Sequence, residues 1–369
     1  MSKIYNRYRQ RSAENESPAD HDARHRATLA SVTTPGRSLP EERPSASVLL
    51  EVKDLKVHFG PRRQRIRAVD GVDFVIAAGE SVGLVGESGC GKSTLGRTVL
   101  GLESPIAGRV VYEGKDVAAF DPEELQTYRG KAQMIFQDPF GSLNPRKTVG
   151  KSIREVLLVH KKGRRSERRR QAEDLFTAVG LDPAYLGRYP HEFSGGQRQR
   201  IGIARALAVQ PRLLIADEPV SALDVSVQVQ ILNLLKDLQQ ERGLTYLFVA
   251  HDLAVVRYLC TRILVMYLGR IVETAAADPM YREPLHPYTK ALLSAVPDVQ
   301  KGLRERNGEK RRIVLEGDVP SPSKPISGCA FHTRCPFAED RCRSEAPALR
   351  ELRQRHYVAC HFAQELAYR

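Results

Sequence analysis

The order of apolar and polar residues along the chain predicts strands that alternate with helices. Compact apolar runs, typical of buried strands, occupy residues 49–59, 72–76, 81–85, 213–216 and 245–250. Apolar residues at helical spacing predict helices over residues 91–100, 172–179, 201–209, 227–238 and 289–296. A closing hairpin is predicted at residues 262–274. This alternation implies right-handed crossovers and an α/β fold with a mixed, largely parallel sheet core.

The same pattern divides the chain into three parts. Residues 1–47 are rich in Ser, Pro, Arg, Glu and Ala without apolar periodicity, and they predict a disordered tail. Residues 48–290 predict the α/β domain, with a helical insertion subdomain at about 140–210. Residues 291–369 predict a small cysteine-rich C-terminal extension. No apolar run approaches the ~18 residues of a membrane span, and the first ten residues lack the apolar stretch of a secretory signal.

The net charge of +13 is concentrated in two short segments. Residues 161–170 carry a surplus of six positive charges, and residues 301–312 carry a surplus of four. Such segments usually form solvated surface, and otherwise attract an acidic partner, a membrane surface or nucleic acid. The chain has neither zinc-finger spacing nor a basic motif interleaved with aromatic residues, so we expect no nucleic-acid partner.

A glycine-rich loop between the strand at 81–85 and the next helix matches G-x-x-x-x-G-K-[ST]. In this motif the backbone N–H groups converge on phosphate oxygens, and the helix N-terminus adds positive potential. We expect Lys92 to reach the β- and γ-phosphates as a catalytic residue, and the Ser93 hydroxyl to ligate Mg²⁺. The loop residues expected to bind nucleotide are Gly86, Glu87, Ser88, Gly89, Cys90, Gly91, Lys92, Ser93 and Thr94.

An apolar strand downstream of this loop ends in two carboxylates, Asp217 and Glu218. In a parallel sheet this position lies at the carboxyl edge, beside the phosphate loop. We expect Asp217 to hold Mg²⁺, directly or through water. We expect Glu218 to be the general base that orients or deprotonates the attacking water. The sequence therefore predicts a P-loop NTPase that hydrolyses its nucleotide.

The segment FSGGQRQR precedes the helix at 201–209 and forms a second candidate anion site at a helix start. A chain with one phosphate loop does not need two such sites. The simpler interpretation is that this segment touches the γ-phosphate of a nucleotide held by a partner subunit. The residues concerned are Ser194, Gly195, Gly196 and Gln197.

In these motifs the chain resembles the nucleotide-binding subunits of ABC transporters, over about residues 49–360. The phosphate loop matches the Walker A motif, residues 213–218 match the Walker B motif, and residues 193–197 match the ABC signature. The resemblance implies an ABC-type ATPase fold that binds ATP and Mg²⁺. It also implies that two such subunits close head-to-tail over two ATP molecules.

The resemblance assigns roles to four further residues. Gln137 fits the Q-loop glutamine, which is implied to ligate Mg²⁺ and to link the γ-phosphate to the transporter subunits. Asp224 fits the D-loop. His251, 33 positions after Glu218, fits the switch histidine. Phe59 occupies the position of the aromatic residue that stacks on adenine, where Tyr is more usual. Catalytic roles are thus implied for Gln137 and His251 in addition to Glu218.

Within this family the chain is most similar to the peptide/nickel importer group, and to its F-type more than its D-type ATPase. The similarity is carried by residues 137–146, 218–225 and 284–289. It implies a D-type ATPase as heterodimer partner, two membrane permease subunits and, indirectly, a solute-binding protein. The subunit is expected at the cytoplasmic face of the inner membrane, bound peripherally. The cargo stays open among dipeptides, oligopeptides, nickel chelates, glutathione and opines.

Four cysteines cluster near the C-terminus, and clustered thiols in a reducing compartment are more often metal ligands than disulfides. Their wide spacing differs from the CxxC pairs of zinc ribbons, and Pro336 follows one of them. This favours an iron–sulfur cluster, and the family resemblance points to a [4Fe–4S] cluster. Zinc, and free thiols or disulfides, are the alternatives. The six arginines in residues 334–355 either stabilise an anionic cluster or lie on the surface, and nearby alternative ligands are His332, His356 and His361. The cysteines are Cys329, Cys335, Cys342 and Cys360.

Two rival functions belong to other classes. One is a soluble ABC ATPase of a non-transport complex, for example in phosphonate degradation. The chain carries no second ATPase half or DNA-binding insertion, which disfavours that class. The other is an inactive regulatory subunit, which the presence of Glu218 and His251 disfavours. We therefore expect an ATPase subunit that energises import of peptides or related small solutes.

Overall fold

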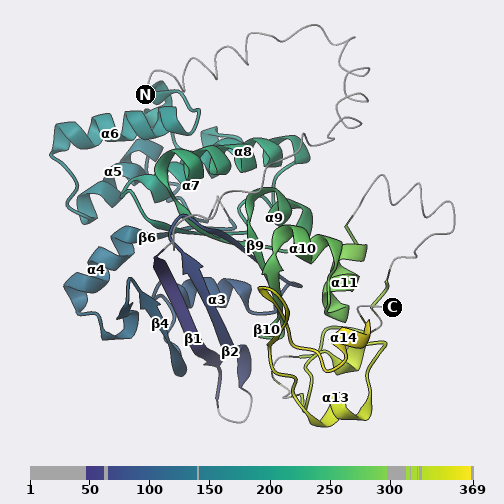
Figure 1. The fold of residues 1–369 in the computed structure, drawn as a ribbon. Helices are drawn as coiled ribbons and strands as arrows, with labels where there is room; N and C mark the ends of the chain where they lie inside the picture. Colours follow the sequence, from purple (N-terminus) through teal and green to yellow (C-terminus); the bar gives the residue numbers. More distant parts are fainter. Residues whose placement is uncertain are drawn as a thin grey trace, which may run out of the picture.

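The structure is a computed structural model with two sheets and helices between and around them (Figure 1). The predicted tail at 1–47, apart from residue 47, lies outside the described residues, as does the basic segment at 301–312. The structure describes residues 47–366 except 62–64, 139–140, 297–312, 316, 322 and 324–325.

A four-stranded antiparallel sheet in the order β2-β1-β4-β5 forms one outer layer. The second strand is longer than the 72–76 predicted, because it pairs with its neighbour along twelve residues, through polar as well as apolar positions. The strands are β1 (Val48–Phe59), β2 (Ile66–Ala77), β4 (Ala107–Tyr112) and β5 (Lys115–Asp116).

An eight-stranded mixed sheet in the order β11-β12-β10-β9-β3-β8-β7-β6 forms the centre of the molecule. Its five strands from β9 to β6 run parallel, and the other three pair antiparallel. The predicted mixed sheet is thus present, and the predicted hairpin is β9 with β10. The strands are β3 (Ser81–Val85), β6 (Ala132–Ile135), β7 (Leu213–Asp217), β8 (Thr245–Ala250), β9 (Arg262–Tyr267), β10 (Arg270–Ala276), β11 (Arg350–Arg353) and β12 (His356–Val358).

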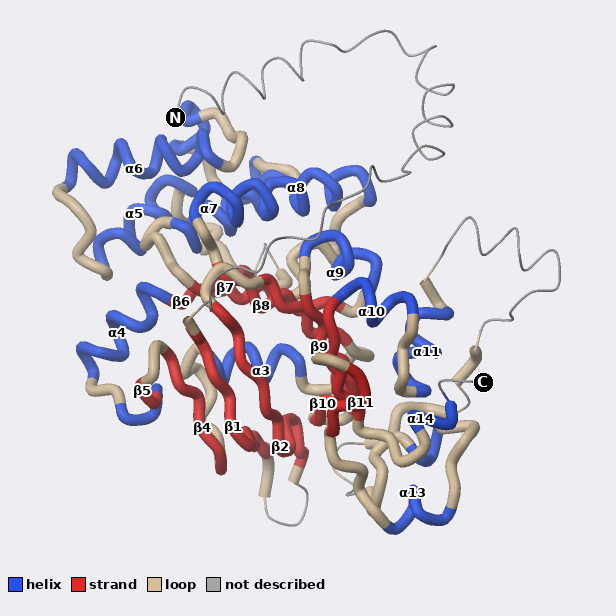
Figure 2. The backbone as a smooth tube through the Cα atoms, in the orientation of Figure 1, coloured by secondary structure: helices blue, strands red, loops and turns tan. Residues whose placement is uncertain are grey.

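Successive side chains of the central strands point to opposite faces and fill two separate cores. Leu213 and Ile215 of β7 belong to the core shared with the four-stranded sheet. Leu214 and Ala216 belong to the core under the helical layer, which Figure 2 shows in blue above the sheet. Between the two sheets lies α3 (Lys92–Val99). The helical layer contains α5 (Val149–Val159), α6 (Arg165–Ala178), α7 (Gly195–Leu207) and α8 (Val225–Arg242).

The remaining α-helices of the described residues are short, with ten residues at most. Within the described residues no helix is long and apolar enough to cross a membrane. The α-helices are α4 (Pro122–Lys131), α9 (Leu253–Leu259), α10 (Ala277–Arg282), α11 (Pro287–Ser294), α13 (Asp340–Ser344) and α14 (Ala363–Leu366). The 3₁₀ helices are η2 (Val117–Ala119), η3 (Pro183–Gly187), η4 (Pro190–Glu192) and η5 (His332–Arg334).

The C-terminal segment continues the central sheet. β12 pairs antiparallel with β10, where Glu273 lies opposite Val358, and β11 then pairs with β12. Glu273 is fully buried, and its carboxylate accepts hydrogen bonds from the backbone N–H groups of Leu285 and His286. The same carboxylate lies 2.7 Å from His356 Nε2. The predicted domain boundary after residue 290 falls within α11. The division of the chain into these domains stays a prediction.

Candidate active site

The phosphate loop connects β3, whose five residues are all buried, to the first turn of α3. Lys92 is 4% exposed, and its Nζ donates to the carbonyl oxygens of Gly86 at 2.8 Å and Glu87 at 2.9 Å. Gly91 has φ of 106°, and a Cβ there would lie 1.9 Å from the carbonyl oxygen of Ala68. Glycine is therefore required at this position. The loop is a compact backbone cradle with the lysine ammonium inside it.

Two oxygen-bearing side chains meet beside this cradle. Ser93 Oγ donates to Asp217 Oδ1 at 2.9 Å, although the two residues are 124 positions apart in the sequence. Asp217 ends β7 and is 3% exposed. Burial raises its pKa, and the hydrogen bond from Ser93 opposes that rise. A hydroxyl and a carboxylate at this distance are the hard oxygen ligands that suit Mg²⁺.

The Glu218 carboxylate is held by two other predicted residues. Gln137 Nε2 donates to Glu218 Oε2 at 2.9 Å, and His251 Nδ1 lies 3.3 Å from the same oxygen. Glu218 has φ of 43°, in the left-handed region that a non-glycine residue adopts at a cost of about 1–3 kcal/mol. A cavity of about 60 Å³ opens between Glu218 and His251, with room for ordered water. This geometry suits a carboxylate that orients a water molecule.

These side chains come from the carboxyl ends of four neighbouring strands. Gln137 follows β6, Asp217 ends β7, His251 follows β8 and the phosphate loop follows β3. The parallel pairing of these strands places all four ends at one edge of the sheet. The structure therefore brings together the predicted ion-binding and catalytic residues Lys92, Ser93, Gln137, Asp217, Glu218 and His251.

Other predicted site residues lie at helix starts in the helical layer. Ser194 caps α7, where its Oγ accepts from Gln197 N at 3.3 Å and its own N–H donates to Gln197 Oε1 at 3.0 Å. Asp224 caps α8 by accepting from Val227 N at 3.0 Å. The helical layer packs on the face of the sheet opposite α3. The cap hydrogen bonds of Ser194 and Asp224 are made to residues of their own helices. Phe59 ends β1 and is 38% exposed, which leaves its ring accessible.

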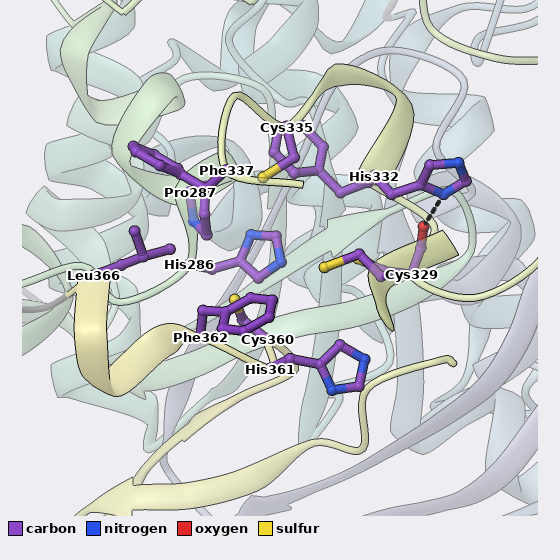
Figure 3. Close-up of a pocket in the computed structure, with 12 residues that line it drawn as sticks. His286, Pro287, Cys329, His332, Cys335, Phe337, Cys360, His361, Phe362 and Leu366 are labelled. Carbon is purple, nitrogen blue, oxygen red and sulfur yellow. Dashed lines mark hydrogen bonds between the residues drawn. The ribbon is translucent and has the colours of Figure 1, made fainter. Parts of the chain in front are cut away.

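The four cysteines of the C-terminal extension line one small pocket. Figure 3 shows the sulfurs of Cys329, Cys335 and Cys360 directed toward a common space beside the His286 ring. The cavity is about 10 Å³, which is room for one water molecule. Burial raises the pKa of Cys335 to about 12 and that of Cys360 to about 11, and also raises the pKa of Cys329. The pocket favours neutral thiols unless a cation enters it.

A single metal ion has no ready site in the part of the chain that the structure describes. There, no three His, Cys, Asp or Glu side chains form a group that could hold one ion. His332 and His361 also line the pocket, but each lies within hydrogen-bond distance of a backbone carbonyl. His356 lies outside the pocket, paired with Glu273. Among the described residues, neither the predicted iron–sulfur cluster nor the alternative zinc ion thus finds a ready-formed site.

Sequence reasoning missed two residues that touch the phosphate loop. Arg334 forms an ion pair with Glu87, and the Tyr288 hydroxyl accepts a hydrogen bond from the Glu87 N–H at 2.9 Å. The available signal was the Tyr in residues 284–289 and the position of Arg334 directly before Cys335. Neither signal identifies a partner more than 200 residues away in the sequence.

Comparison with known proteins adds family information to this geometry. The family described as ABC transporter matches residues 69–221, and the one described as oligopeptide/dipeptide transporter, C-terminal region, matches residues 272–342. The chain is 52% identical over 322 residues to the oligopeptide transport ATP-binding protein AppF of Bacillus subtilis, covering 85% of this chain and 97% of that protein. It is also 52% identical over 312 residues to a putative peptide import ATP-binding protein of Brucella ovis, with 85% and 97% covered.

Two solved structures share the fold. The ATP-binding cassette MJ0796, dimeric and bound to ADP and Pi, has a TM-score of 0.57 and 31% identity, covering 62% of this chain and 99% of that one. CbiO1 of Clostridium perfringens, part of an ABC transporter complex, has a TM-score of 0.58 and 25% identity, covering 71% and 95%.

Proposed function

Because the chain belongs to the ABC transporter family of ATPases, we propose that it is the ATP-hydrolysing subunit of an importer that energises the uptake of peptides across the inner membrane. The family, the P-loop ATPase fold and the enzyme class predicted from the sequence are confirmed. The observation that carries the proposal is the convergence of Gln137 and His251 on the Glu218 carboxylate beside the phosphate loop. The peptide cargo is proposed from the names of the relatives and the matching C-terminal region.

In the proposed site, Lys92 and the backbone N–H groups of residues 86–94 bind the β- and γ-phosphates. Ser93, Asp217 and Gln137 hold Mg²⁺, which neutralises phosphate charge when bound. Support comes from the 2.9 Å contact of Ser93 with Asp217 and from the oxygen donors that all three side chains supply.

The proposed general base is Glu218. Its carboxylate accepts a proton from the attacking water, and His251 and Gln137 hold it in place on the side of the γ-phosphate. Phe59 stacks on the adenine ring.

We propose that residues 194–197 and Asp224 act on the nucleotide of a second ATPase subunit. They lie at the N-termini of α7 and α8, where backbone N–H groups attract phosphate. The proposed partner is a D-type ATPase, so that this chain is the F-type half of a heterodimer, and the dimeric MJ0796 cassette supports a paired state. Two permease subunits hold the pair at the cytoplasmic face of the inner membrane, and a solute-binding protein delivers the cargo.

Replacing Glu218 by Gln tests the base assignment. We expect hydrolysis to fall by about a hundredfold or more, because the amide cannot accept the proton. ATP binding is expected to persist, because the variant leaves the phosphate loop unchanged. Phosphate release and the binding of a fluorescent ATP analogue measure the two properties. Unchanged hydrolysis contradicts the assignment.

The soluble, non-transport alternative is not favoured, since the relatives are named for transport and import. Affinity purification from membranes in mild detergent separates the two functions. Copurification with two multispanning proteins supports the importer. A complex that is recovered entirely without such proteins contradicts it.

For the cysteine pocket we propose a [4Fe–4S] cluster bound by Cys329, Cys335, Cys342 and Cys360. The donor set fits, because each iron of such a cluster takes one thiolate. Support comes from the shared pocket, which all four cysteines line. The cavity of about 10 Å³ requires the thiol side chains to turn aside on loading.

Anaerobic purification followed by iron, sulfide and zinc analysis tests this cluster. We expect about four irons and four sulfides per chain with a broad visible absorbance. Cys335→Ala is expected to lose this absorbance. Cys260→Ala, which removes a buried thiol outside the pocket, is the matched control and should keep it. One zinc per chain, or no bound metal, contradicts the proposal.

A further inference from the structure

The C-terminal segment reaches the phosphate loop through one largely buried ion pair. Arg334 Nη1 and Nη2 donate to the two carboxylate oxygens of Glu87 at 2.7 and 3.1 Å. The Arg334 side chain is 8% exposed and that of Glu87 is 26% exposed. Two parallel, charge-assisted hydrogen bonds are among the strongest and most directional polar contacts in proteins. The pair joins residues that are 247 positions apart.

Aromatic packing fixes the position of Arg334. Phe331, in the turn before it, is 1% exposed, and its carbonyl accepts from Arg334 N at 3.0 Å. The Phe331 ring lies 5.2 Å from that of Tyr267, nearly perpendicular to it, and 5.4 Å from that of Tyr288. Such ring pairs prefer defined angles and resist rotation. The guanidinium is thus held by a packed loop as well as by its charge.

Glu87 has a second attachment to the same aromatic group. Its N–H donates to the Tyr288 hydroxyl at 2.9 Å, and its carbonyl accepts from Lys92 Nζ at 2.9 Å. The glycines of this loop permit many backbone conformations. Glu87 is one of the positions at which residues outside the loop limit that freedom.

The negative charge of Glu87 also affects nucleotide binding, and the ion pair with Arg334 changes that effect. An unpaired carboxylate in this loop repels the triphosphate that the loop is proposed to bind. Arg334 neutralises that carboxylate without occupying the phosphate cradle. Ordering the loop in advance lowers the entropy that binding must overcome. Both effects favour the nucleotide-bound state.

We propose that Arg334 is a positioning residue, which by pairing with Glu87 holds the phosphate loop ready for nucleotide, so that the C-terminal segment sets the ATP affinity of the ATPase. The inference rests on the proposed nucleotide site and adds a second segment of the chain to it. It places the control of affinity one residue from Cys335, at the edge of the cysteine pocket.

The test uses the full-length chain and a fluorescent ATP analogue with Mg²⁺. Arg334→Met, which keeps the length of the side chain and removes its charge, is expected to raise the Kd and the KM for ATP about tenfold. We expect kcat at saturating ATP to stay within about twofold, since the hydrolytic residues are untouched. Arg334→Lys keeps the charge and should recover part of the affinity. The matched control is Arg341→Met, whose pair with Glu345 is exposed.

A double-mutant cycle separates positioning from a general structural role. In a Glu87→Gln background, Arg334→Met should add little to the Kd, because the pair is already broken. An unchanged Kd in Arg334→Met, or an equal effect in both backgrounds, overturns the inference. If Arg334→Met does not fold, Arg334→Gln takes its place with the same expected rise in the Kd, and an unchanged Kd there overturns the inference. Wild-type chain that binds no ATP overturns the proposed function instead.

Discussion

At the scale of single residues, the Glu218 carboxylate is where separate parts of the chain meet. Gln137 and His251 approach the same oxygen, Oε2, at 2.9 and 3.3 Å. Gln137 donates to this oxygen, His251 lies beside it, and Glu218 lines the adjoining cavity. A carboxylate held in this way beside a cavity is preorganised to orient a water molecule.

Asp70 provides a pH-dependent link between the two sheets. It lies in β2 and accepts a hydrogen bond from Arg270 of β10 at 2.8 Å. Burial alone would raise the pKa of Asp70, but Arg270, Arg67 and His58 outweigh it and hold the pKa below its ordinary value. We expect Asp70→Asn to lower the free energy of unfolding by about 1 kcal/mol at pH 7, because the Arg270 side chain is partly exposed and screened.

The sign of the pH effect follows from the lowered pKa. The stabilisation is fully present above the unfolded-state pKa of about 3.9 and is lost as the pH falls through the lower folded-state value. Urea unfolding should therefore show a clear difference between wild type and Asp70→Asn at pH 5, and a smaller difference below about pH 4. Asp237→Asn, at an exposed position of α8, is the control. A difference that grows on acidification contradicts the assignment.

The residues of the site differ in how far the sequence predicts them. Lys92 and Asp217 belong to local motifs in which each residue type has a chemical reason, and the structure places them together. Arg334 has no such motif. Surface placement and thiolate neutralisation are equally consistent with its sequence context, and the structure shows a third outcome, the pair with Glu87. Such a partner depends on the packing of distant segments, which periodicity does not contain.

At the scale of elements, the first turn of α7 packs closely on α8. A Cβ at Gly196 would lie 2.5 Å from Val227 Cγ1, which is too close for two carbon atoms. Val227 is β-branched and has one strongly preferred rotamer in a helix, so it cannot turn aside freely. The lack of a side chain at Gly196 thus allows the start of α7 to lie this close to α8.

Gly196→Ala should therefore destabilise the protein although alanine favours helices. We expect a loss of about 1–3 kcal/mol in the free energy of unfolding, because overpacking outweighs the helix preference. ATPase activity is also expected to fall, because the start of α7 moves. Urea unfolding and phosphate release measure the two effects.

Gly202 offers a matched control in the same helix. A Cβ at that position has nothing within 4 Å. Gly202→Ala should stabilise the protein by about 0.5–1 kcal/mol, since only the helix preference acts there. Equal effects of the two substitutions would show that the contact with Val227 is unimportant.

The limits of elements were harder to predict than their existence. The helix predicted at 172–179 is α6, which begins at Arg165. Its first turns carry arginines that face solvent, so the apolar pattern starts late, whereas the hydrogen bond of Arg164 N to Glu167 marks the true start. The spacing of apolar residues indicates only the part of a helix that is buried, so it does not predict turns that are exposed to solvent.

At the scale of the whole molecule, the central sheet makes the ATPase and the C-terminal segment one unit. β12 covers an edge of β10 that would otherwise present unpaired backbone groups. Glu273 and His356 form a buried pair across this junction. The extension is thus part of the ATPase sheet rather than an appendage on a linker.

A charged residue in β12 should separate β12 from β10 and expose the edge of β10. Val358 is fully buried opposite Glu273, and Val358→Asp is expected to cost about 3–5 kcal/mol by burying an unpaired carboxylate. With β10 uncovered, the protein should aggregate, as static light scattering would detect. Gln354→Asp, at an exposed position between β11 and β12, is the control and should remain monodisperse. A soluble Val358→Asp variant of unchanged stability contradicts this account.

The position of β3 also has a consequence for how the chain is made. β3 lies between β8 and β9, and Ser81 pairs with Tyr246. During synthesis the strand that leads into the phosphate loop therefore emerges long before either neighbour exists, with the backbone groups of both edges unpaired and its apolar side chains exposed. A large stretch of chain must be gathered before the central sheet can close, which slows folding. We therefore expect the nascent chain to bind chaperones until β8 and β9 have been synthesised.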